Sequence, residues 1–558
     1  MKQNRFTIWL KGWPQWGKIT AIVVLTLAVL ASAVGGIVWL DTRPAAMQSD
    51  ASSAASLFSP ETTAGKTGST GSTVAPSADT TAAGAPGTTA DAVHTQETTV
   101  PHTTAGAAPC TNLFSAPDGI PASETASLRV NGEPCFVYDT LVNFRRRSPA
   151  GNAHDVLERE KAPVAVWETD GQNAVSITYA GATVRSAAVT PQALGITPEV
   201  EGDTVIFTIP GPGQYTVEIN DSAHQAFHLF VNPPYSPPAP GGNTLIYGPG
   251  VHEVGEVRLR SGQTVYLAGG AVVRGWFVGN GVSNVRIYGS GIVDGSIYPR
   301  YKADGVGSAA HPPIQFSNCT AMQLEGITFL DPAGWTVNTY HCTDVTVNRV
   351  NIISSRQNGD GITTQSCTNQ TVTNCFVRSW DDSLVVKAYE GNVRDILFDS
   401  CILWTDLAQS CEVGFETRGD TMENITFQNI TVLHNYHKAV MSVHNGDHAV
   451  IRGVTFRNIV VEKAEMGEGD GWNYLFDLQV ADTIWSKEDE RGRIEQVTFD
   501  NIRVLAGRTP YSRLEGFDAA HGIDGVTFRD VWVLGRPVTD AKSGYMQINA
   551  FVKNVVFS

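Results

Sequence analysis

Three aspartates are the residues of this chain whose types and spacing best suit chemistry. Asp360 lies in the segment NGDG, and Asp381 and Asp382 follow 21 and 22 residues later in WDDSLVVK, with Arg378 and Lys387 as the nearby cations in the sequence. Glycoside hydrolysis needs a neutral carboxylic acid that protonates the leaving oxygen, and an ionised carboxylate that activates water or attacks carbon. The three aspartates therefore form a candidate hydrolytic site.

Each aspartate also has an ordinary structural interpretation. NGDG is a turn sequence, and a pair such as Asp381 and Asp382 can cap a corner between strands. Three like charges stacked together, however, cost stability that a purely structural turn has no reason to incur. Calcium bound by the carboxylates is the other means of making such a stack tolerable.

The sequence around the aspartates repeats itself, and the repeat predicts the scaffold. Copies such as NITFQNITV, GVTFRNIVV and QVTFDNIRV alternate apolar and polar residues, with Asn, Gly or Asp at the corners. A strand-rich repeat of 23 to 43 residues predicts a parallel β-helix, in which each coil buries its inward side chains against its neighbours. The third positions of the copies are Leu324, Val347, Val372, Phe398, Phe427, Phe456, Phe499 and Phe528.

We therefore expect an all-β chain with a right-handed parallel β-helix as the catalytic domain over 243–558. In that β-helix NGDG and WDDS align on successive coils, which places Asp360 over Asp382 and Asp381 beside it. Neighbouring parallel strands lie about 4.8 Å apart, so mutual repulsion should raise the pKa of at least one carboxyl. Left-handed turn geometry is expected at the corner asparagines Asn348, Asn374, Asn429 and Asn458.

A smaller unit is expected before the β-helix. Over 109–235, short β-rich runs such as DTVIFTIPGPGQYTVEI alternate with turn residues and show no helical period, which predicts a small β-sandwich. The Pro/Gly-rich segment 236–242 is the expected linker.

The amino-terminal 108 residues differ in composition from the rest. We expect a basic cytoplasmic segment over 1–18 and an apolar membrane anchor over 19–40, with a cleavable signal peptide as the alternative. The Ala/Thr/Ser/Pro/Gly-rich stretch 41–108 is expected to be a disordered stalk. The folded part would then be attached to the cell surface, or secreted if the signal is cleaved, and the amino-terminal segment would be its only contact with a membrane.

Charge and cysteine content limit the partners. A net charge of −16 opposes binding to nucleic acid. Eight cysteines follow the stalk, an even number that permits disulfides, and a zinc site is the less favoured alternative because no C-x-x-C segment accompanies them. We expect neither a metal nor a cofactor. The favoured disulfide pairings are Cys110 with Cys135, Cys367 with Cys375, and Cys401 with Cys411.

The acidic segments resemble those of a known group of enzymes. NGDG followed by WDDS resembles the NTDG and DD motifs of the polygalacturonase family of β-helix glycoside hydrolases. The downstream segments KAY, ILW and VLHNY are more similar to the related dextranase and isopullulanase family, whose members carry an amino-terminal β-sandwich. The resemblance implies an inverting hydrolase that acts on a polysaccharide, with Asp381 as the general acid and Asp360 and Asp382 holding and deprotonating the water.

The substrate-binding residues are expected close to these acids. The segment Cys411–Glu416 stands in place of the Gly-His-Gly of the polygalacturonase pattern, and no R-I-K segment corresponding to its later Arg-x-Lys appears. A carboxylate-rich site disfavours an anionic sugar, so we expect a neutral glycan such as a dextran-like α-glucan or an arabinan. The candidates for substrate binding are Asn358, Lys387, Glu412, Glu416 and His444.

Further alternatives follow from the same residues. The acids would hold calcium in a uronate polysaccharide lyase, and they would be incidental in a non-catalytic glycan-binding adhesin. A polygalacturonase is the alternative within the hydrolases. One or two of six aromatic residues are expected to stack on sugar rings: Trp380, Tyr389, Trp404, Tyr436, Trp472 and Tyr474.

Overall fold

The fold is described here from a computed structural model of the chain, which describes residues 110–143, 159–303, 308–467 and 472–558. These residues form strands and one short 3-10 helix, η3 (Gln192–Leu194). The expected anchor and stalk lie outside the described residues. No helix within the described ranges is long and apolar enough to cross a membrane.

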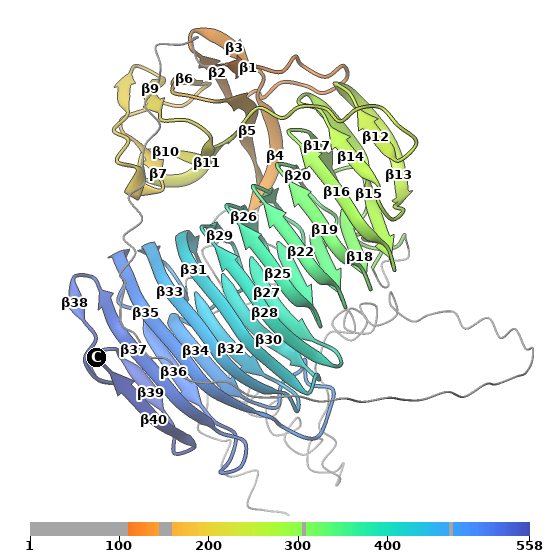
Figure 1. Cartoon of the computed structure of the whole chain (residues 1–558). Helices are drawn as coiled ribbons and strands as arrows, with labels where there is room; N and C mark the ends of the chain where they lie inside the picture. Colours follow the sequence, from red (N-terminus) through yellow and green to blue (C-terminus); the bar gives the residue numbers. More distant parts are fainter. Residues whose placement is uncertain (1–109, 144–158, 304–307, 468–471) are drawn as a thin grey trace, which may run out of the picture. The chain divides into compact units, whose positions relative to one another are not determined.

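The amino-terminal part consists of two β-sheets, as expected for a sandwich (Figure 1). The larger sheet contains β1 (Thr111–Asn112), β4 (Tyr138–Asn143), β5 (Arg159–Thr169), β7 (Ala187–Thr190), β10 (Gly213–Ile219) and β11 (Ser222–Asn232). The smaller sheet contains β2 (Ala126–Val130), β3 (Glu133–Cys135), β6 (Asn173–Tyr179), β8 (Glu199–Glu201) and β9 (Thr204–Ile209). Buried side chains of both sheets, Trp167 and Phe207 among them, form one hydrophobic core.

The remainder is a parallel β-helix of 29 strands, which confirms the predicted fold class. Its strands form three ladders in which each strand pairs in parallel with the equivalent strand of the next coil. The ladder that carries the candidate site, called the site ladder below, contains β18 (Ile314–Ser317), β21 (Val337–Tyr340), β24 (Ile362–Gln365), β27 (Leu384–Ala388), β30 (Cys411–Thr417), β32 (Met441–Asn445), β34 (Tyr474–Val480), β36 (Tyr511–Glu515) and β39 (Met546–Ile548).

The other two ladders complete each coil. The second contains β12 (Thr244–Tyr247), β14 (Thr264–Leu267), β16 (Ser283–Gly289), β19 (Thr320–Glu325), β22 (Thr343–Asn348), β25 (Thr368–Thr373), β28 (Asn392–Asp399), β31 (Thr421–Asn435), β33 (Val450–Ala464), β35 (Arg493–Gly507), β37 (Ile523–Val533) and β40 (Val552–Phe557). The third contains β13 (Gly250–Arg258), β15 (Ala271–Asn280), β17 (Ile292–Asp294), β20 (Thr328–Leu330), β23 (Asn351–Ile353), β26 (Phe376–Ser379) and β29 (Ile402–Thr405), and it continues into β31. The short strand β38 (Arg536–Pro537) pairs with β37 in antiparallel fashion.

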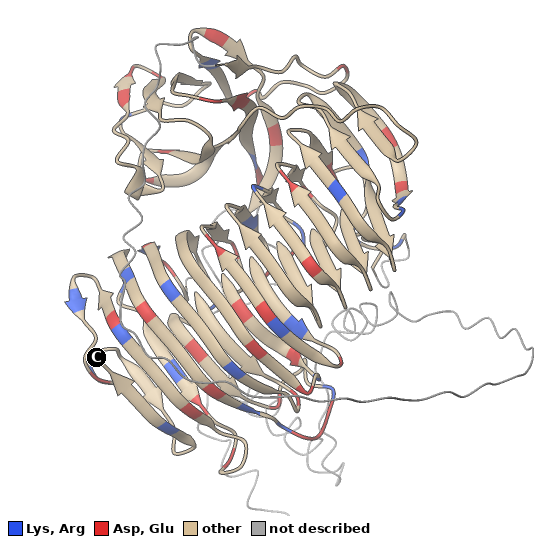
Figure 2. Cartoon of the chain, in the orientation of Figure 1, with Lys and Arg blue, Asp and Glu red and all other residues tan. Residues whose placement is uncertain are grey.

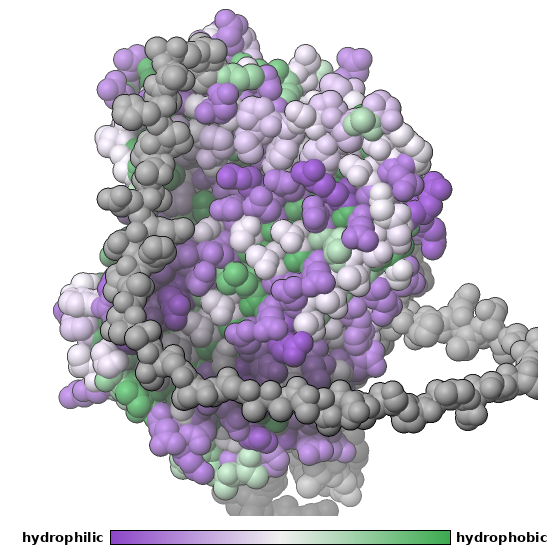
Figure 3. Space-filling model, viewed as in Figure 1, coloured by the Kyte–Doolittle hydropathy of each residue, from purple (hydrophilic) through white to green (hydrophobic). Residues whose placement is uncertain are grey.

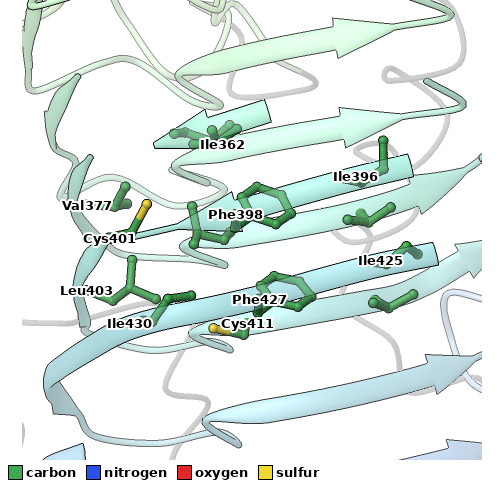
Figure 4. Packing of buried hydrophobic residues seen from close by; sticks show 14 of the residues in the cluster. Ile362, Val377, Ile396, Phe398, Cys401, Leu403, Cys411, Ile425, Phe427 and Ile430 are labelled. Carbon is green, nitrogen blue, oxygen red and sulfur yellow. The ribbon is translucent and has the colours of Figure 1, made fainter. Parts of the chain in front are cut away.

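The register of the second ladder agrees with the repeat found in the sequence. Leu324, Val347, Val372 and the phenylalanines that follow pair in order along the ladder. Phe398 and Phe427 stack in the core with ring centroids 4.8 Å apart (Figure 4). Four more steps of 5.0–5.1 Å extend the stack to Phe557. One apolar position per coil therefore builds a continuous core column.

The corners use asparagine much as the sequence predicts. Asn374, Asn429 and Asn458 have φ values of 53–55°, in the left-handed region, whereas Asn348 does not and its neighbour Arg349 does, with φ 53°. The Asn458 side-chain amide donates to Asn429 Oδ1 at 2.9 Å on the preceding coil. A corner asparagine thus satisfies the turn and links neighbouring coils.

The outer face of the second ladder is polar. Asp500 on β35 accepts hydrogen bonds from Arg457 on β33 and Arg529 on β37, and Figure 2 shows acidic and basic residues interspersed over the strands. Hydrophilic residues likewise predominate on the face seen in Figure 3. Solvent-facing positions therefore alternate with the core positions along each strand.

All eight cysteines are free thiols in the structure, so the three expected disulfides are not formed. The six-residue strand β25 separates Cys367 from Cys375 and holds them about 20 Å apart, far beyond the reach of a disulfide. Cys401 and Cys411 also lie apart in the core (Figure 4). Cys110 lies beside Asp170 near the larger sheet of the sandwich, while Cys135 belongs to the smaller one. The predicted pairings were wrong because they assumed that cysteines close in sequence lie close in space, whereas a coil can place such residues on different ladders.

Candidate active site

The three aspartates lie just before strands of the site ladder, at equivalent positions of successive coils. The Gly361 amide donates to the Asp382 carbonyl oxygen at 2.8 Å, and Ile362 pairs with Leu384 in the parallel register. Asp360 therefore occupies the same place on its coil as Asp382 on the next coil. Asp381 lies beside Asp382, whose amide donates to Asp381 Oδ1 at 3.1 Å. The alignment expected from NGDG and WDDS is present.

Burial distinguishes the three carboxyls. Asp360 and Asp382 are 2% and 8% exposed, whereas Asp381 is partly exposed. No described residue donates a hydrogen bond to the buried Asp360 Oδ1. Asp382 Oδ1 accepts a hydrogen bond from the backbone N–H of Gln409, on the following coil, at 3.2 Å. Asp381 is thus the carboxyl of the three that is open to solvent.

The surroundings raise the pKa of both buried aspartates. Burial is the main cause at Asp360, the negative charge of Asp381 adds to it, and Lys387 opposes it. Burial and Asp381 also raise the pKa of Asp382, and Lys387 again opposes the shift. A low-dielectric site with several neighbouring carboxyls favours sharing protons among them. This arrangement can keep one carboxyl neutral beside an ionised one.

Lys387 faces the acids from strand β27. Its Nζ lies 3.2 Å from Glu416 Oε2 and 3.9 Å from Asp360 Oδ2. Burial lowers the pKa of Lys387, but Glu416 and Asp360 outweigh it and hold the pKa well above its ordinary value. The ammonium also lies 5.0 Å from the ring centroid of Trp335. Lys387 is therefore a charged partner of the acids, whereas Arg378 points away from them, toward Asp406 and the ring of Trp404.

Glu412 and His444 belong to a buried network on the outer side of the same ladder. His444 Nδ1 lies 2.8 Å from Glu412 Oε1, and His444 Nε2 lies 3.2 Å from Asp477 Oδ2. Burial lowers the pKa of His444, but the two carboxylates raise it to about 10. The ring of Phe415 stacks on the imidazole at 4.1 Å. His444 is thus an imidazolium held between two acids and covered by an aromatic ring.

The other predicted binding residues are placed as follows. Glu416 lies beside Lys387, as described. Asn358 Oδ1 accepts a hydrogen bond from the Arg300 guanidinium, so the Asn358 side chain is engaged with Arg300. The structure brings Lys387, Glu412 and Glu416 together with the aspartates, since Glu412 and Glu416 contribute to the raised pKa values of Asp382 and Asp360.

Four residues of this region were not predicted from the sequence. Trp335 and Gln409 occupy the positions equivalent to Asp360 and Asp382 on the flanking coils, as the interstrand hydrogen bonds show. Asp477 pairs with Arg513 of the next coil through hydrogen bonds of 2.9 and 2.8 Å. Aligning the site-ladder strands coil by coil would have found them, but the 43-residue interval hides the coil that contains Asp477.

Most of the six aromatic residues considered for sugar stacking are packed, in keeping with the expectation that one or two of them would bind sugar. Trp380, Trp404 and Tyr436 are 4%, 0% and 1% exposed. Tyr389 is half-buried beneath the Arg418 guanidinium. Trp472 is 68% exposed and stacks on Tyr474, which is 8% exposed, with ring centroids 6.2 Å apart. Trp472 is therefore the member of the predicted set that is available to a ligand.

No group of three or more His, Cys, Asp or Glu side chains within the described ranges has an arrangement suited to a metal ion. The acids of the candidate site are instead neutralised in part by Lys387, which faces two of them.

The segment that contains the candidate site is similar to a family of known proteins. Residues 251–468 match the family model described as glycosyl hydrolases family 28, and this segment contains all of the predicted site residues. The resemblance to the polygalacturonase and dextranase clan of β-helix hydrolases is thereby confirmed, and the prediction of a glycosidase is supported.

Individual relatives are distant. A probable polygalacturonase of Arabidopsis thaliana is 23% identical over 192 residues, which cover 34% of this chain and 41% of the relative. A probable exopolygalacturonase B of Neosartorya fischeri is 27% identical over 207 residues, or 33% of this chain and 45% of the relative. These alignments span less than half the length of either relative.

A solved structure resembles the chain over a greater length. Dex49A from Penicillium minioluteum superposes with a TM-score of 0.51 at 16% identity, covering 80% of this chain and 96% of that protein. At this identity the likeness concerns the fold.

Proposed function

We propose that this protein is a glycoside hydrolase that cleaves a polysaccharide by a single inverting displacement. The observation that carries the proposal is that Asp360 and Asp382 occupy equivalent positions of successive coils, with Asp381 beside Asp382, and that two of the three carboxyls are buried and one is partly exposed. The acidic groups that the reaction requires are thus present together, in the segment that matches the hydrolase family.

Asp381 is the proposed general acid. It is the most exposed of the three carboxyls, and it would transfer its proton to the glycosidic oxygen as the bond to the anomeric carbon breaks. Asp360 and Asp382 would orient a water molecule and accept its proton as its oxygen attacks the anomeric carbon. One water is consumed, and the products are a new reducing end and a free hydroxyl. Inversion at the anomeric carbon is proposed from the resemblance to the family.

The charges around the acids favour a neutral substrate. Lys387 is committed to Asp360 and Glu416, and Arg513 is committed to Asp477. A sugar carboxylate placed here would face several carboxyl groups, because Glu412 and Glu416 add to the three aspartates, and like charges in a buried site repel strongly. Sugar hydroxyls, in contrast, can donate hydrogen bonds to carboxylates. We propose a neutral glycan, of the dextran or arabinan kind.

A polygalacturonan-like substrate is the second candidate. The curated relatives that the chain matches are named polygalacturonases. Arg418 lies over the ring of Tyr389. Burial raises the pKa of the Tyr389 hydroxyl, and the positive charges of Lys387 and Arg418 oppose that rise. Arg418 is therefore the residue that would meet a sugar carboxylate if the substrate is a uronate polymer.

Incubating the full chain with dextran, arabinan, galactan and polygalacturonate tests the proposal. We expect new reducing ends from a neutral polymer, with the first product of inverted anomeric configuration by proton NMR, in the presence of a chelator. The Asp381→Asn variant is the blank. Release of reducing ends from polygalacturonate alone would favour the second candidate. Products with ultraviolet-absorbing unsaturation that require calcium would indicate a lyase, and no product from any polymer would contradict hydrolysis.

A further inference from the structure

Aromatic residues continue the row of the acids on the last three coils of the site ladder. Tyr474 pairs with Tyr511 across β34 and β36, and Ser512 pairs with Met546, which puts Tyr545 opposite Tyr511 on the following coil. The Tyr511 and Tyr545 rings lie 6.0 Å apart. One tyrosine per coil therefore stands at the place where Asp360 and Asp382 stand on earlier coils.

These rings are accessible in a way that a packed aromatic is not. Tyr511 and Tyr545 are 51% and 48% exposed, and Trp472 beside Tyr474 is 68% exposed. Strand β36 alternates regularly between exposed and buried residues, and Tyr511 shares its outward side with Arg513. Large aromatic side chains at consecutive outward positions leave a considerable apolar area in water, which is the usual mark of a binding surface.

A chain of polar contacts joins this aromatic row to the acids. Glu412, which raises the pKa of Asp382, contacts His444, and His444 contacts Asp477. Asp477 binds Arg513, whose guanidinium carbon lies 4.7 Å from the ring centroid of Tyr474. Glu412, His444 and Asp477 are buried, so these contacts run beneath the surface. The strand register places the acids and the tyrosines on the same ladder.

Sugar rings bind such a surface through their apolar faces. Aromatic rings of tyrosine and tryptophan offer flat apolar area together with a polar edge that forms hydrogen bonds. We propose that Tyr511, Tyr545 and Trp472 form distal subsites that stack on sugar units of the same glycan chain whose cleavage the acids carry out. This inference rests on the proposed function and names its substrate class: a polymer that extends along the axis of the β-helix.

The spacing sets the length of that polymer. Asp382 and Tyr511 are separated by four coils, or about 19 Å, and Tyr545 lies one coil farther, at about 24 Å. Several sugar units fit between the bond that is cleaved and these rings. A short oligosaccharide that fills only the subsites next to the acids cannot reach them, whereas a long chain can.

The test compares a polymer with a short oligosaccharide of the same linkage. The double variant Tyr511→Ala/Tyr545→Ala should raise KM for the polymer about tenfold, which corresponds to the loss of two stacking contacts, and leave kcat unchanged. Its kcat/KM for the oligosaccharide should equal that of the unaltered protein. Tyr511→Phe/Tyr545→Phe retains the rings and should retain most of the polymer affinity.

Trp532→Ala is the matched control, because Trp532 is 38% exposed but belongs to β37 on the second ladder. Trp532→Ala should change neither KM nor kcat for either substrate. Equal KM values for the double variant and this control on the polymer would overturn the inference and leave the proposed hydrolysis intact. An equal loss on polymer and oligosaccharide would also overturn it, since that result would indicate general damage.

Binding without hydrolysis is measured separately, so that failure of the proposed function can be recognised. The unaltered protein should be retarded in native gels cast with dextran, arabinan or polygalacturonate, and the alanine double variant should be retarded clearly less in the same gel. Retardation with no hydrolysis would contradict the proposed function while upholding the glycan-binding row. Equal retardation of both proteins, or retardation of neither in all three gels, would overturn the row.

Discussion

At the scale of single residues, the candidate site is a place where charge is held at a cost to stability. Asp360 and Asp382 are buried beside other carboxyls, and the pKa of each is raised. Ionising them in the folded protein is therefore less favourable than ionising them in the unfolded chain. A site that is retained despite this cost is typical of catalysis.

Replacing Asp360 by Asn should therefore stabilise the protein while abolishing activity. The ordinary pKa of this carboxyl is 3.8, and its folded pKa is higher, so the protein loses stability as pH rises from about 4 through the folded value. Asn cannot ionise and removes that loss. We expect the melting temperature of Asp360→Asn to exceed that of the unaltered protein at pH 7.5, and the two to converge near pH 3.5.

Asp399→Asn provides a control of opposite sign. Hydrogen bonds from Asn429, Gln428 and Ser400 outweigh burial and lower the pKa of Asp399, so this carboxylate contributes stability above its ordinary pKa that is lost as pH falls. The same substitution should here lower the melting temperature at pH 7.5. A drop in both variants would contradict the account of Asp360.

His444 makes the second prediction at this scale. Its pKa of about 10 exceeds the ordinary value of 6.5, so the imidazolium contributes stability that is fully present below pH 6.5 and is lost as pH rises through about 10. His444→Gln leaves Glu412 and Asp477 without their shared counter-charge and should cost about 3 kcal/mol of unfolding free energy at pH 6. Urea unfolding should show that this deficit has largely disappeared near pH 11. An equal deficit at both pH values would mean that packing, not charge, is lost.

At the scale of elements, the ladders divide the work between stability and chemistry. The second ladder holds the phenylalanine column, in which Phe456 stacks between Phe427 and Phe499 at 5.1 Å on either side. The site ladder presents its functional groups on outward positions, while its inward positions join the same core. A core change in the second ladder should therefore affect folding without altering the site.

Phe456→Ala tests this division. Removing a fully buried ring from the column should cost about 3–5 kcal/mol, whereas Trp532→Ala on the exposed side of β37 should cost less than about 1 kcal/mol. At a temperature where both variants are folded, hydrolysis per folded molecule should match the unaltered protein. A lowered kcat in folded Phe456→Ala, with the melting cost absent, would contradict the separation of roles.

How far the sequence predicted these elements depends on the kind of contact. The repeat placed Phe398 to Phe528 in register and put Asp360 over Asp382, because each coil adds one similar turn and errors do not accumulate over short intervals. It did not reveal Asp477 and Arg513, because the long interval before Phe499 breaks the period. The cysteine pairings predicted from the sequence were also wrong, since separation along the chain does not determine which ladder of the β-helix a residue lies on.

At the scale of the whole molecule, the thiols provide a prediction that covers both the sandwich and the β-helix. Seven of the eight cysteines are buried and Cys110 is exposed, and none is paired. We expect a thiol-alkylating reagent to modify one cysteine in the native protein and eight after unfolding without reductant, counted by mass spectrometry. Fewer than eight in the unfolded, unreduced protein would show that disulfides form after all.

The same scale unites the acids and the aromatic row, because both lie on one ladder along the helix axis. A β-helix offers an extended surface, and its coils present equivalent positions at intervals of about 4.8 Å, which suits a repeating polymer. The acids and the aromatic row are each defined by local contacts, whereas their alignment follows from the regular stacking of coils along the whole β-helix.

The most direct test of the central claim is the rate of reducing-end release from the best polymer substrate by the three single variants Asp360→Asn, Asp381→Asn and Asp382→Asn. Each should lower kcat by at least about 100-fold relative to the unaltered protein, because each removes a proton donor or acceptor of one reaction. Each variant should remain folded by its melting curve. Full activity in any one of these three folded variants would contradict the claim that these carboxyls catalyse hydrolysis.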